Sequence, residues 1–402
     1  MIKRISNSSH LMVSAFKDHR RAGVIRVISI VKRDELQKLY CLLCHTKTNT
    51  SATSPGPGHG AAPQCELSEA KVEIHTDHYH FPYGTSDIFC NSTPSSMEAT
   101  HVAITADPNT VQSSEYLLIK NKKIAEPFQY DFTVCISNLF GDYNNALQFL
   151  QTMEVYKLMG IQRVVIYNTS SGPDVEKVLK YYKKEGMLEV VPWPIDKFLN
   201  PSRGWQPDKD PGDLHYYGQT TTLNECIYRY MYQSRYLLLN DIDEIIMPYN
   251  TRKIPNLVDF VDDLQKKYPK AGVFRFENRV YPRTVCQCDD GGRFRLLEWE
   301  SVPGANILQH IYNQPYNGKE YKEYKMIIDP RRVEQTSVHQ ALETFGAQIL
   351  VPFDICHVIH ITFRKKHVRY QKELYEDRKL WEFETNLIPI FNHALHKSGL
   401  LK

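Results

Sequence analysis

The sequence predicts an α/β protein built on a doubly wound, mostly parallel β-sheet. From about residue 130, short β-branched runs alternate with segments whose apolar residues recur at the spacing of a helix. One run, residues 236–239, is apolar at every position, which is typical of a strand buried on both faces of a parallel sheet. Strands separated by helices in this order imply right-handed βαβ crossovers.

The elements are assigned in chain order from their patterns and end signals. The first helix ends at Gly160 and the second at Gly186, because glycine readily takes the left-handed conformation that closes a helix. In a sheet of this kind, ligands bind beyond the carboxyl ends of the strands. The strands are expected at 132–136, 164–167, 188–191 and 236–239, and the helices around 146–156, 175–182 and 223–231.

The composition is that of an ordinary globular protein. Of the 402 residues, 42% are hydrophobic and 24% charged, and the formal net charge is only +3. That charge excludes the strongly basic class of nucleic-acid-binding proteins. We expect three parts: an N-terminal stem or linker and accessory region at 1–128, an α/β domain at 129–390 and a C-terminal tail at 391–402. Within the first part, the low-complexity stretch 48–63 has the composition of a flexible linker.

Two aspartates follow the last predicted strand, in the sequence Asn240-Asp-Ile-Asp-Glu244. Side chains alternate along a strand, so Asp241 and Asp243 should share one face. Two such carboxylates repel each other unless a cation lies between them. Their oxygens suit Mg²⁺ or Mn²⁺, which often complete their shell with phosphate oxygens. The sequence therefore predicts a site for a metal-bound pyrophosphate, most simply that of a nucleotide-diphosphate donor. The alternative is an acidic turn that caps a helix starting near Asn256.

Several longer motifs occur in one order along the chain. They are Cys135-Ile-Ser-Asn-Leu-Phe-Gly-Asp-Tyr-Asn144, Glu154-Val-Tyr-Lys-Leu-Met-Gly160, Gly218-Gln-Thr-Thr-Thr-Leu-Asn-Glu-Cys226 and Leu237-Leu-Leu-Asn-Asp-Ile-Asp-Glu244. With these motifs the chain resembles GT-A glycosyltransferases, and more closely glycosyltransferase family 92, formerly the domain of unknown function 23. The resemblance covers about 130–370, and residues before about 128 take no part in it.

The resemblance implies a catalytic domain with a GT-A-like fold. It implies an inverting transfer of galactose from UDP-galactose to a glycan, as in the animal N-glycan β-1,4-galactosyltransferases, with Mn²⁺ or Mg²⁺ as the metal. Asp241 and Asp243 would hold the metal and the diphosphate, and Ser137 and Asn138 would lie near the donor nucleotide. GT-A enzymes often take a third metal ligand from a later histidine, and His339 matches that position best.

Other residues match the family less closely. His360, with Arg364, matches a later motif only in part, and the strand end Tyr167-Asn168 would also lie near the nucleotide. An inverting transfer needs a carboxylate that takes the proton from the acceptor hydroxyl. Spacing does not choose among the candidates for this general base, which are Glu277, Asp289, Asp290, Glu298 and Glu300. The basic residues expected to contact phosphate are Lys325, Arg331 and Arg332.

The sequence alone and the family resemblance predict different cellular locations. No stretch of 18 apolar residues is present, so the sequence alone predicts a soluble protein. Animal members of the family are usually type II Golgi membrane proteins. We therefore expect a Golgi lumenal enzyme whose membrane anchor is absent from this chain, with 48–63 in its stem.

The cysteines fit an oxidising lumen. Cys41-Leu-Leu-Cys44 has zinc-knuckle spacing, but the second pair that a tetrahedral zinc site needs does not follow. In the lumen, the nine cysteines would form up to four disulfides. We expect the remaining cysteine to be Cys41 or Cys44.

The sequence leaves two alternatives to an active transferase. An aspartate-based phosphotransferase would carry its catalytic aspartate after the first strand, whereas here the pair follows the fourth. A catalytically inactive glycan-binding domain of the same fold is the second alternative, and the intact Asp241 and Asp243 argue against it. The expected partners are a UDP-sugar donor and a glycan or glycoprotein acceptor, without nucleic acid, and with a membrane only through an anchor.

Overall fold

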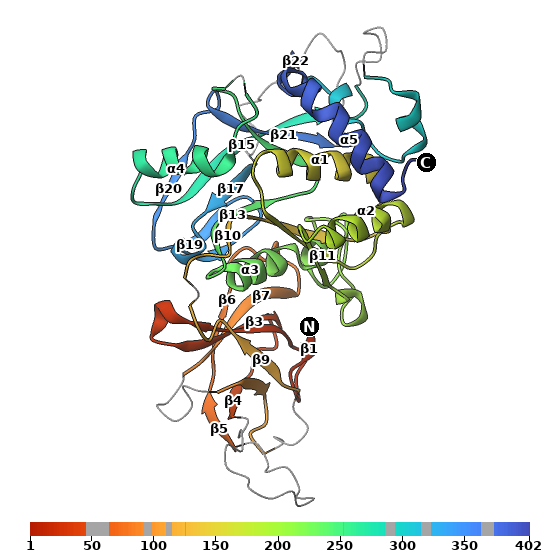
Figure 1. Ribbon diagram of the computed structural model, residues 1–402. Coiled ribbons are helices and arrows are strands. Elements are labelled where there is room, and N and C mark those ends of the chain that lie inside the picture. The colour runs from red at the N-terminus through yellow and green to blue at the C-terminus, as the bar shows by residue number, and fades with distance from the viewer. Residues whose placement is uncertain are drawn as a thin grey trace, which may run out of the picture. The chain divides into compact units, whose positions relative to one another are not determined.

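The structure is a computed structural model. It describes residues 1–45, 64–91, 99–109, 115–124, 126–251, 253–285, 294–314, 323–362 and 374–402. The chain forms two compact units, one of residues 1–126 with 193–232 and the other of residues 127–192 with 233–402 (Figure 1). The predicted linker 48–63 lies outside the described residues. Within the described ranges, no helix has the length and hydrophobicity to cross a membrane.

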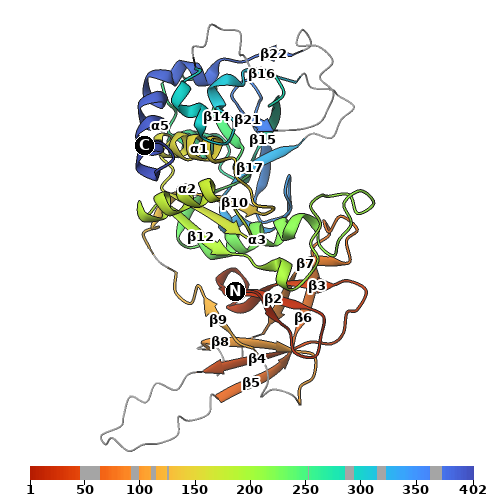
Figure 2. The same cartoon turned by 90° about the vertical axis from the view of Figure 1, so that its right-hand side faces the viewer.

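The first unit is built on one mostly antiparallel sheet. Figure 2 shows β4, β5 and β8 side by side in it. The helix α3 (Gln219–Tyr230) packs against β2, β3 and β7. The strand order is β5 (Gln64–Glu69), β4 (Tyr40–His45), β8 (His101–Thr105), β9 (Leu117–Lys120), β2 (Leu11–Asp18), β3 (Val24–Lys32), β7 (Tyr83–Cys90) and β6 (Lys71–Ile74), with β1 (Lys3–Arg4) paired to β2.

Two disulfides cross-link this sheet, Cys41–Cys90 and Cys44–Cys65. Positions three apart on a strand face opposite sides, so the two cysteines of β4 reach different partners. Cys44 lies directly opposite Cys65 on the neighbouring strand β5. The expectation that Cys41 or Cys44 is the unpaired cysteine is therefore wrong. Among the described residues, the free cysteine is Cys356, which is buried in the second unit.

A buried carboxylate ties α3 to the N-terminal strands. Glu225 has no exposed side-chain surface. It accepts a hydrogen bond from Ser14 of β2 at 2.7 Å, pairs with Arg229 at 2.8 Å and lies 3.5 Å from Lys120 of β9. Residues 193–232 thus belong to the same unit as the N-terminal strands. The first unit breaks at residue 126, close to the boundary expected at 128, but it also takes in residues 193–232. This addition was not expected, because long-range packing leaves no mark on the local sequence pattern.

The second unit is built on a mixed sheet. The four predicted strands occur and are parallel, in the order β12 (Leu188–Pro192), β11 (Arg163–Asn168), β10 (Tyr130–Leu139) and β13 (Ser234–Asn240). The later strands run in mixed directions, so the parallel arrangement does not extend through the whole sheet. They are β17 (Tyr324–Ile328), β15 (Ala271–Pro282), β21 (Cys356–Thr362) and β14 (Glu244–Pro248), with β20 (Ala347–Leu350) paired to β15.

Helices pack on this sheet, and the helices and strands share one hydrophobic core. Phe132 and Val134 of β10 pack in the same cluster as Leu150 and Met153 of α1. The helices are α1 (Ala146–Leu158), α2 (Pro173–Lys184), α4 (Leu257–Lys267) and α5 (Glu384–Ser398), and two short pairs complete the unit, β16 (Tyr312–Asn313) with β22 (Tyr375–Glu376) and β18 (Val333–Thr336) with β19 (Ala341–Thr344).

The C-terminal residues expected to form a tail from 391 mostly belong to α5. Phe391 and Leu395 are fully buried in the core of the second unit. The helix continues to Ser398 and ends at Gly399, which takes the left-handed conformation of a helix C-terminus.

We predict that Glu225→Ala destabilises the first unit by about 3 kcal/mol, because it leaves the charge of Arg229 beside a buried site without its partner. The free energy of unfolding in urea measures the effect. Glu69→Ala, which removes an exposed ion pair with Lys38, serves as the control and should leave the transition unchanged. Equal stability of both variants would contradict the role given to Glu225.

Candidate functional site

The two aspartates lie in a tight turn between β13 and β14, and not on a strand. Their side chains are nevertheless both accessible, 30% for Asp241 and 26% for Asp243, while Ile242 and Glu244 are buried. The turn is closed from within, because the side chain of Asn240 donates to the backbone carbonyl of Glu244 at 2.8 Å. The strand alternation from which a shared face was predicted does not occur here, because residues 241–243 form a turn.

The helix-capping alternative does not describe this turn. Helix α4 begins at Leu257 and is capped by the side chain of Asn256, which accepts hydrogen bonds from the backbone of Val258 and Asp259. Glu244 opens strand β14 instead, paired to His360 of β21.

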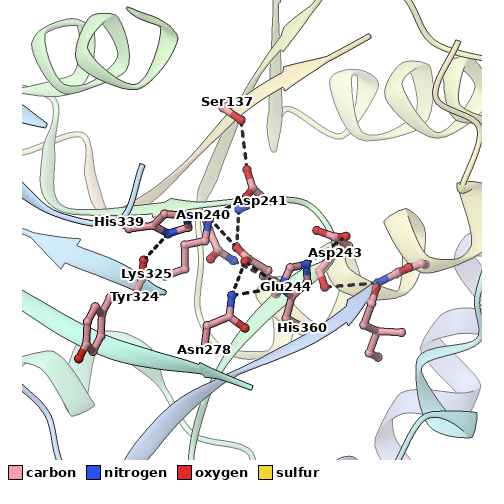
Figure 3. Close-up of polar contacts among 12 residues, drawn as sticks. Ser137, Asn240, Asp241, Asp243, Glu244, Asn278, Tyr324, Lys325, His339 and His360 are labelled. Carbon is pink, nitrogen blue, oxygen red and sulfur yellow. Dashed lines mark hydrogen bonds and ion pairs between the residues drawn. The ribbon is translucent and has the colours of Figure 1, made fainter. Parts of the chain in front are cut away.

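Lys325 of β17 lies directly beside the aspartate turn (Figure 3). Its Nζ is 2.6 Å from Oδ2 of Asp241 and 3.1 Å from Oε2 of Glu244, and its side chain is only 2% exposed. The same Glu244 oxygen accepts the backbone N–H of Asp241 at 2.9 Å. The sequence suggested Lys325 as a phosphate contact, and in the structure its ammonium contacts the two carboxylates.

These contacts perturb the protonation of all three groups. Burial alone would raise the pKa of Asp241, but the charge and hydrogen bond of Lys325 lower it to about 2. Burial raises the pKa of Glu244 against the opposing effect of Lys325. Burial would lower the pKa of Lys325, yet Asp241 and Glu244 raise it well above its usual range. The aspartate of the turn and the lysine are therefore both charged at neutral pH.

His360 of β21 connects Asp243 to Glu244. Its Nε2 lies 3.4 Å from Oδ2 of Asp243, and its Nδ1 lies 3.4 Å from Oε1 of Glu244. Asn278 of β15 adds a hydrogen bond to the same Glu244 oxygen at 3.0 Å and lies 3.1 Å from Nδ1 of the histidine. The backbone of Ile361 donates to the carbonyl of Asp243 at 3.1 Å. The second aspartate is thus held by β21, on the opposite side from Lys325.

Ser137 reaches the aspartates through an irregularity in β10. The pairing of β10 with β11 shifts register between Ile136 and Asn138, so that Ser137 is an extra residue on its strand. Its hydroxyl donates to Oδ1 of Asp241 at 3.1 Å. Asn138 pairs with Tyr167 at the carboxyl ends of the two strands. The structure therefore brings Ser137 to the aspartate turn and puts Asn138 beside Tyr167.

His339 is oriented by the backbone at the start of β17. Its Nδ1 lies 3.2 Å from the carbonyl oxygen of Tyr324, which can only accept, so Nδ1 carries the hydrogen. In the neutral ring Nε2 is then the acceptor, the arrangement common in metal-bound histidines. Burial, reinforced by the charge of Lys325, lowers the pKa of His339 to about 4. The neutral form needed by a metal ligand therefore prevails at neutral pH.

The described candidates for the general base, Glu277, Glu298 and Glu300, make no recorded contact with this turn. Glu277 pairs with Tyr324 in the sheet, whereas Lys325 pairs with Phe276, so Glu277 points to the other face, where it forms an ion pair with Arg279 at 2.9 Å. Glu298 and Glu300 are exposed on a short 3₁₀ turn whose Trp299 donates to Asn392 of α5. Asp289, Asp290 and Arg364 lie outside the described residues.

The two arginines expected to contact phosphate lie elsewhere. Arg331 donates to the carbonyls of Ser234 and Arg235, where β13 begins, at the edge of the sheet opposite Asp241. Arg332 donates to the carbonyls of Pro269 and Ala271 near the start of β15. Both guanidinium groups therefore fix the backbone at the amino-terminal ends of strands.

Sequence reasoning missed Asn240, Glu244 and Asn278 as parts of the site. Glu244 adjoins the aspartate pair, and the alternation of charged and apolar residues there was the available signal. Asn278 comes from a strand 34 residues later, and nothing in its neighbourhood marks it.

A divalent cation fits the chemistry of this donor set. Among the described residues, no three His, Cys, Asp or Glu side chains are gathered closely enough to hold a metal ion by themselves. Mg²⁺-type ions, however, are usually held by one or two carboxylates together with substrate phosphates, and not by a complete protein cage. Asp241 and Asp243 supply two accessible carboxylates, and His339 has Nε2 as an acceptor. These residues suit a metal that arrives with phosphate.

Comparisons with known proteins agree with the resemblance noted from the motifs. The beta-1,4-galactosyltransferase galt-1 of Caenorhabditis elegans is 28% identical over 134 residues, which is 32% of this chain and 29% of that protein. A glycosyltransferase family 92 protein of the same organism is 21% identical over 271 residues, 65% of this chain and 50% of that one. A galactan beta-1,4-galactosyltransferase of Arabidopsis thaliana is 25% identical over 140 residues, 34% and 25% of the two chains.

The matched part of the chain spans half or less of the length of these curated relatives. Among solved structures, that of Staphylococcus aureus TarS covers 66% of this chain and 65% of its own, at 9% identity with a TM-score of 0.28, which is too low for a comparison of folds. The sequence model of glycosyltransferase family 92 matches residues 130–392, about two thirds of the chain and the region that carries the aspartate turn. The chain therefore belongs to glycosyltransferase family 92.

Proposed function

We propose that this glycosyltransferase moves galactose from UDP-galactose to a glycan acceptor such as an N-glycan, with inversion and with the help of Mn²⁺ or Mg²⁺. The observation that carries the proposal is the pair of accessible carboxylates, Asp241 and Asp243, in the turn that follows β13. The galactosyltransferase names of two of the relatives support galactose as the sugar.

The residues in and around the turn have distinct tasks in this proposal. Asp241 and Asp243 hold the metal and through it the diphosphate, with His339 as the further ligand. Ser137 orients Asp241, and His360 with Asn278 orients Asp243 and Glu244. When bound, the metal neutralises charge that develops on the departing UDP. The general base is not assigned, because spacing does not choose among the candidates. One of them, Glu277, forms an ion pair with Arg279 on the other face of the sheet.

The compartment belongs to the same proposal. The disulfides Cys41–Cys90 and Cys44–Cys65 support folding in an oxidising compartment, and we place the enzyme in the Golgi lumen. Co-localisation with a Golgi marker in cells tests this, and a cytosolic distribution would contradict it.

We predict that Asp241→Asn and Asp243→Asn each lower the transfer of galactose about 100-fold or more, because each removes a charged ligand at the point where leaving-group charge is stabilised. The assay incubates the protein with UDP-galactose, Mn²⁺ and fucosylated N-glycans. Asp263→Asn, which changes a 77% exposed aspartate on α4, is the matched control and should retain activity. An active Asp243→Asn variant would refute the metal site. Glycan binding by the wild type without transfer from any UDP-sugar would favour the inactive binding domain.

His339 and His360 are expected to differ as metal ligands. His339→Asn should raise the Mn²⁺ concentration needed for half-maximal transfer about 10- to 100-fold. His360→Asn should have the smaller effect, because both ring nitrogens of His360 face neighbouring side chains. Titration of the initial rate with Mn²⁺ measures both, and a larger effect at His360 would reverse the assignment.

The metal-free protein should lose stability on acidification through His339. Its pKa is about 4 in the folded chain and ordinarily 6.5, so unfolding takes up a proton between these values. The free energy of unfolding therefore falls as the pH falls below 6.5. His339→Asn should show a shallower decline between pH 7 and pH 5, measured by urea denaturation in EDTA. Equal slopes in the two proteins would contradict the lowered pKa.

A further inference from the structure

The ammonium group of Lys325 occupies a position between two carboxylates that a metal ion would also seek. It lies 2.6 Å from Asp241 and 3.1 Å from Glu244, within a side chain that is 2% exposed (Figure 3). A buried charge is costly unless it is paired, so the two carboxylates hold the lysine in place. One oxygen of Asp241 is therefore already bound to a cation that the protein itself supplies.

The charged groups at the turn both attract and repel a second cation. Asp241, Asp243 and Glu244 contribute three carboxylates against the one ammonium of Lys325. A divalent cation bound to Asp241 would share that carboxylate with the lysine, and two positive charges so close repel each other. Lys325 contacts Asp241 and Glu244, whereas Asp243 faces His360, so the carboxylate of Asp243 would attract the metal. Attraction and repulsion thus oppose each other at one small site.

A diphosphate changes this balance, because its oxygens bring negative charge to both cations. We infer that Lys325 makes metal binding depend on the nucleotide, so that the divalent cation binds weakly to the turn alone and tightly together with a nucleoside diphosphate. The inference rests on the proposed function, since it requires the metal and the nucleotide at this site. Lys325 acts through Asp241 and is a positioning residue.

Calorimetric titration of the full chain with Mn²⁺, in the presence and absence of UDP, tests the inference. In the wild type, UDP should lower the dissociation constant of Mn²⁺ about 10-fold or more, within the usual range of coupling between two ligands. Lys325→Met keeps the bulk of the side chain without its charge. It should bind Mn²⁺ alone about 10-fold more tightly than the wild type and lose most of the UDP effect. Lys325→Arg, which keeps the charge, should retain the UDP effect.

A folded Lys325→Met variant that binds Mn²⁺ alone no more tightly than the wild type would overturn the inference and leave the proposed function standing. Absence of Mn²⁺ binding by the wild type, with and without UDP, would overturn both. If circular dichroism shows that Lys325→Met does not fold, Glu244→Gln gives a test of opposite sign. It leaves the lysine with the Asp241 carboxylate, so Mn²⁺ alone should bind more weakly than in the wild type. Unchanged binding by Glu244→Gln would overturn the inference.

Discussion

The ion pairs of Lys325 with Asp241 and Glu244 are the interaction on which the rest of the candidate site depends. They join β17 to the turn between β13 and β14, across 84 residues of sequence. Glu244 is almost completely buried, and its contacts with the lysine, with Asn278 and with the backbone of Asp241 stabilise the turn from below. Removing one member would leave a buried charge unpaired, which proteins rarely tolerate without loss of stability. The accessible carboxylates of Asp241 and Asp243 are therefore supported by buried polar contacts.

In this arrangement, some residues hold the turn in place and others are accessible to a ligand. Glu244 and Lys325 are buried and hold the turn, whereas Asp241 and Asp243 are accessible to a ligand. Asp241 takes part in both, because one of its oxygens contacts the lysine and the other accepts from Ser137. In the proposed site, the strength with which the turn holds a cation would thus depend on Lys325, which is fixed in the sheet.

Much of the second unit could be predicted from the sequence, because local periodicity reports burial. The strands β10, β11, β12 and β13 and the helices α1 and α2 occur at the expected places, and the resemblance to the family is confirmed by its sequence model. Asp241 and Asp243 were expected on one face of a strand, whereas they lie in a turn after β13.

The remaining features arise from contacts between distant residues, which no local pattern contains. The pairing of Lys325 with Asp241, the place of Asn278 and the binding of α3 to the N-terminal strands through Glu225 are of this kind. The extra residue at Ser137 in β10 becomes visible only when the strand is paired with β11. Both cysteines of β4 are paired, Cys44 with Cys65 of the neighbouring strand β5 and Cys41 with Cys90 of β7, which is not a neighbour of β4 in the sheet.

The central claim is that the turn of Asp241 and Asp243 binds a divalent cation together with a nucleoside diphosphate. Anomalous X-ray diffraction from crystals grown with Mn²⁺ and UDP tests it most directly. The account predicts one strong manganese peak within coordination distance of both aspartates, shared with the phosphate oxygens of UDP, while Lys325 still contacts Asp241. UDP bound without manganese at this turn, or manganese bound away from the two aspartates, would contradict it.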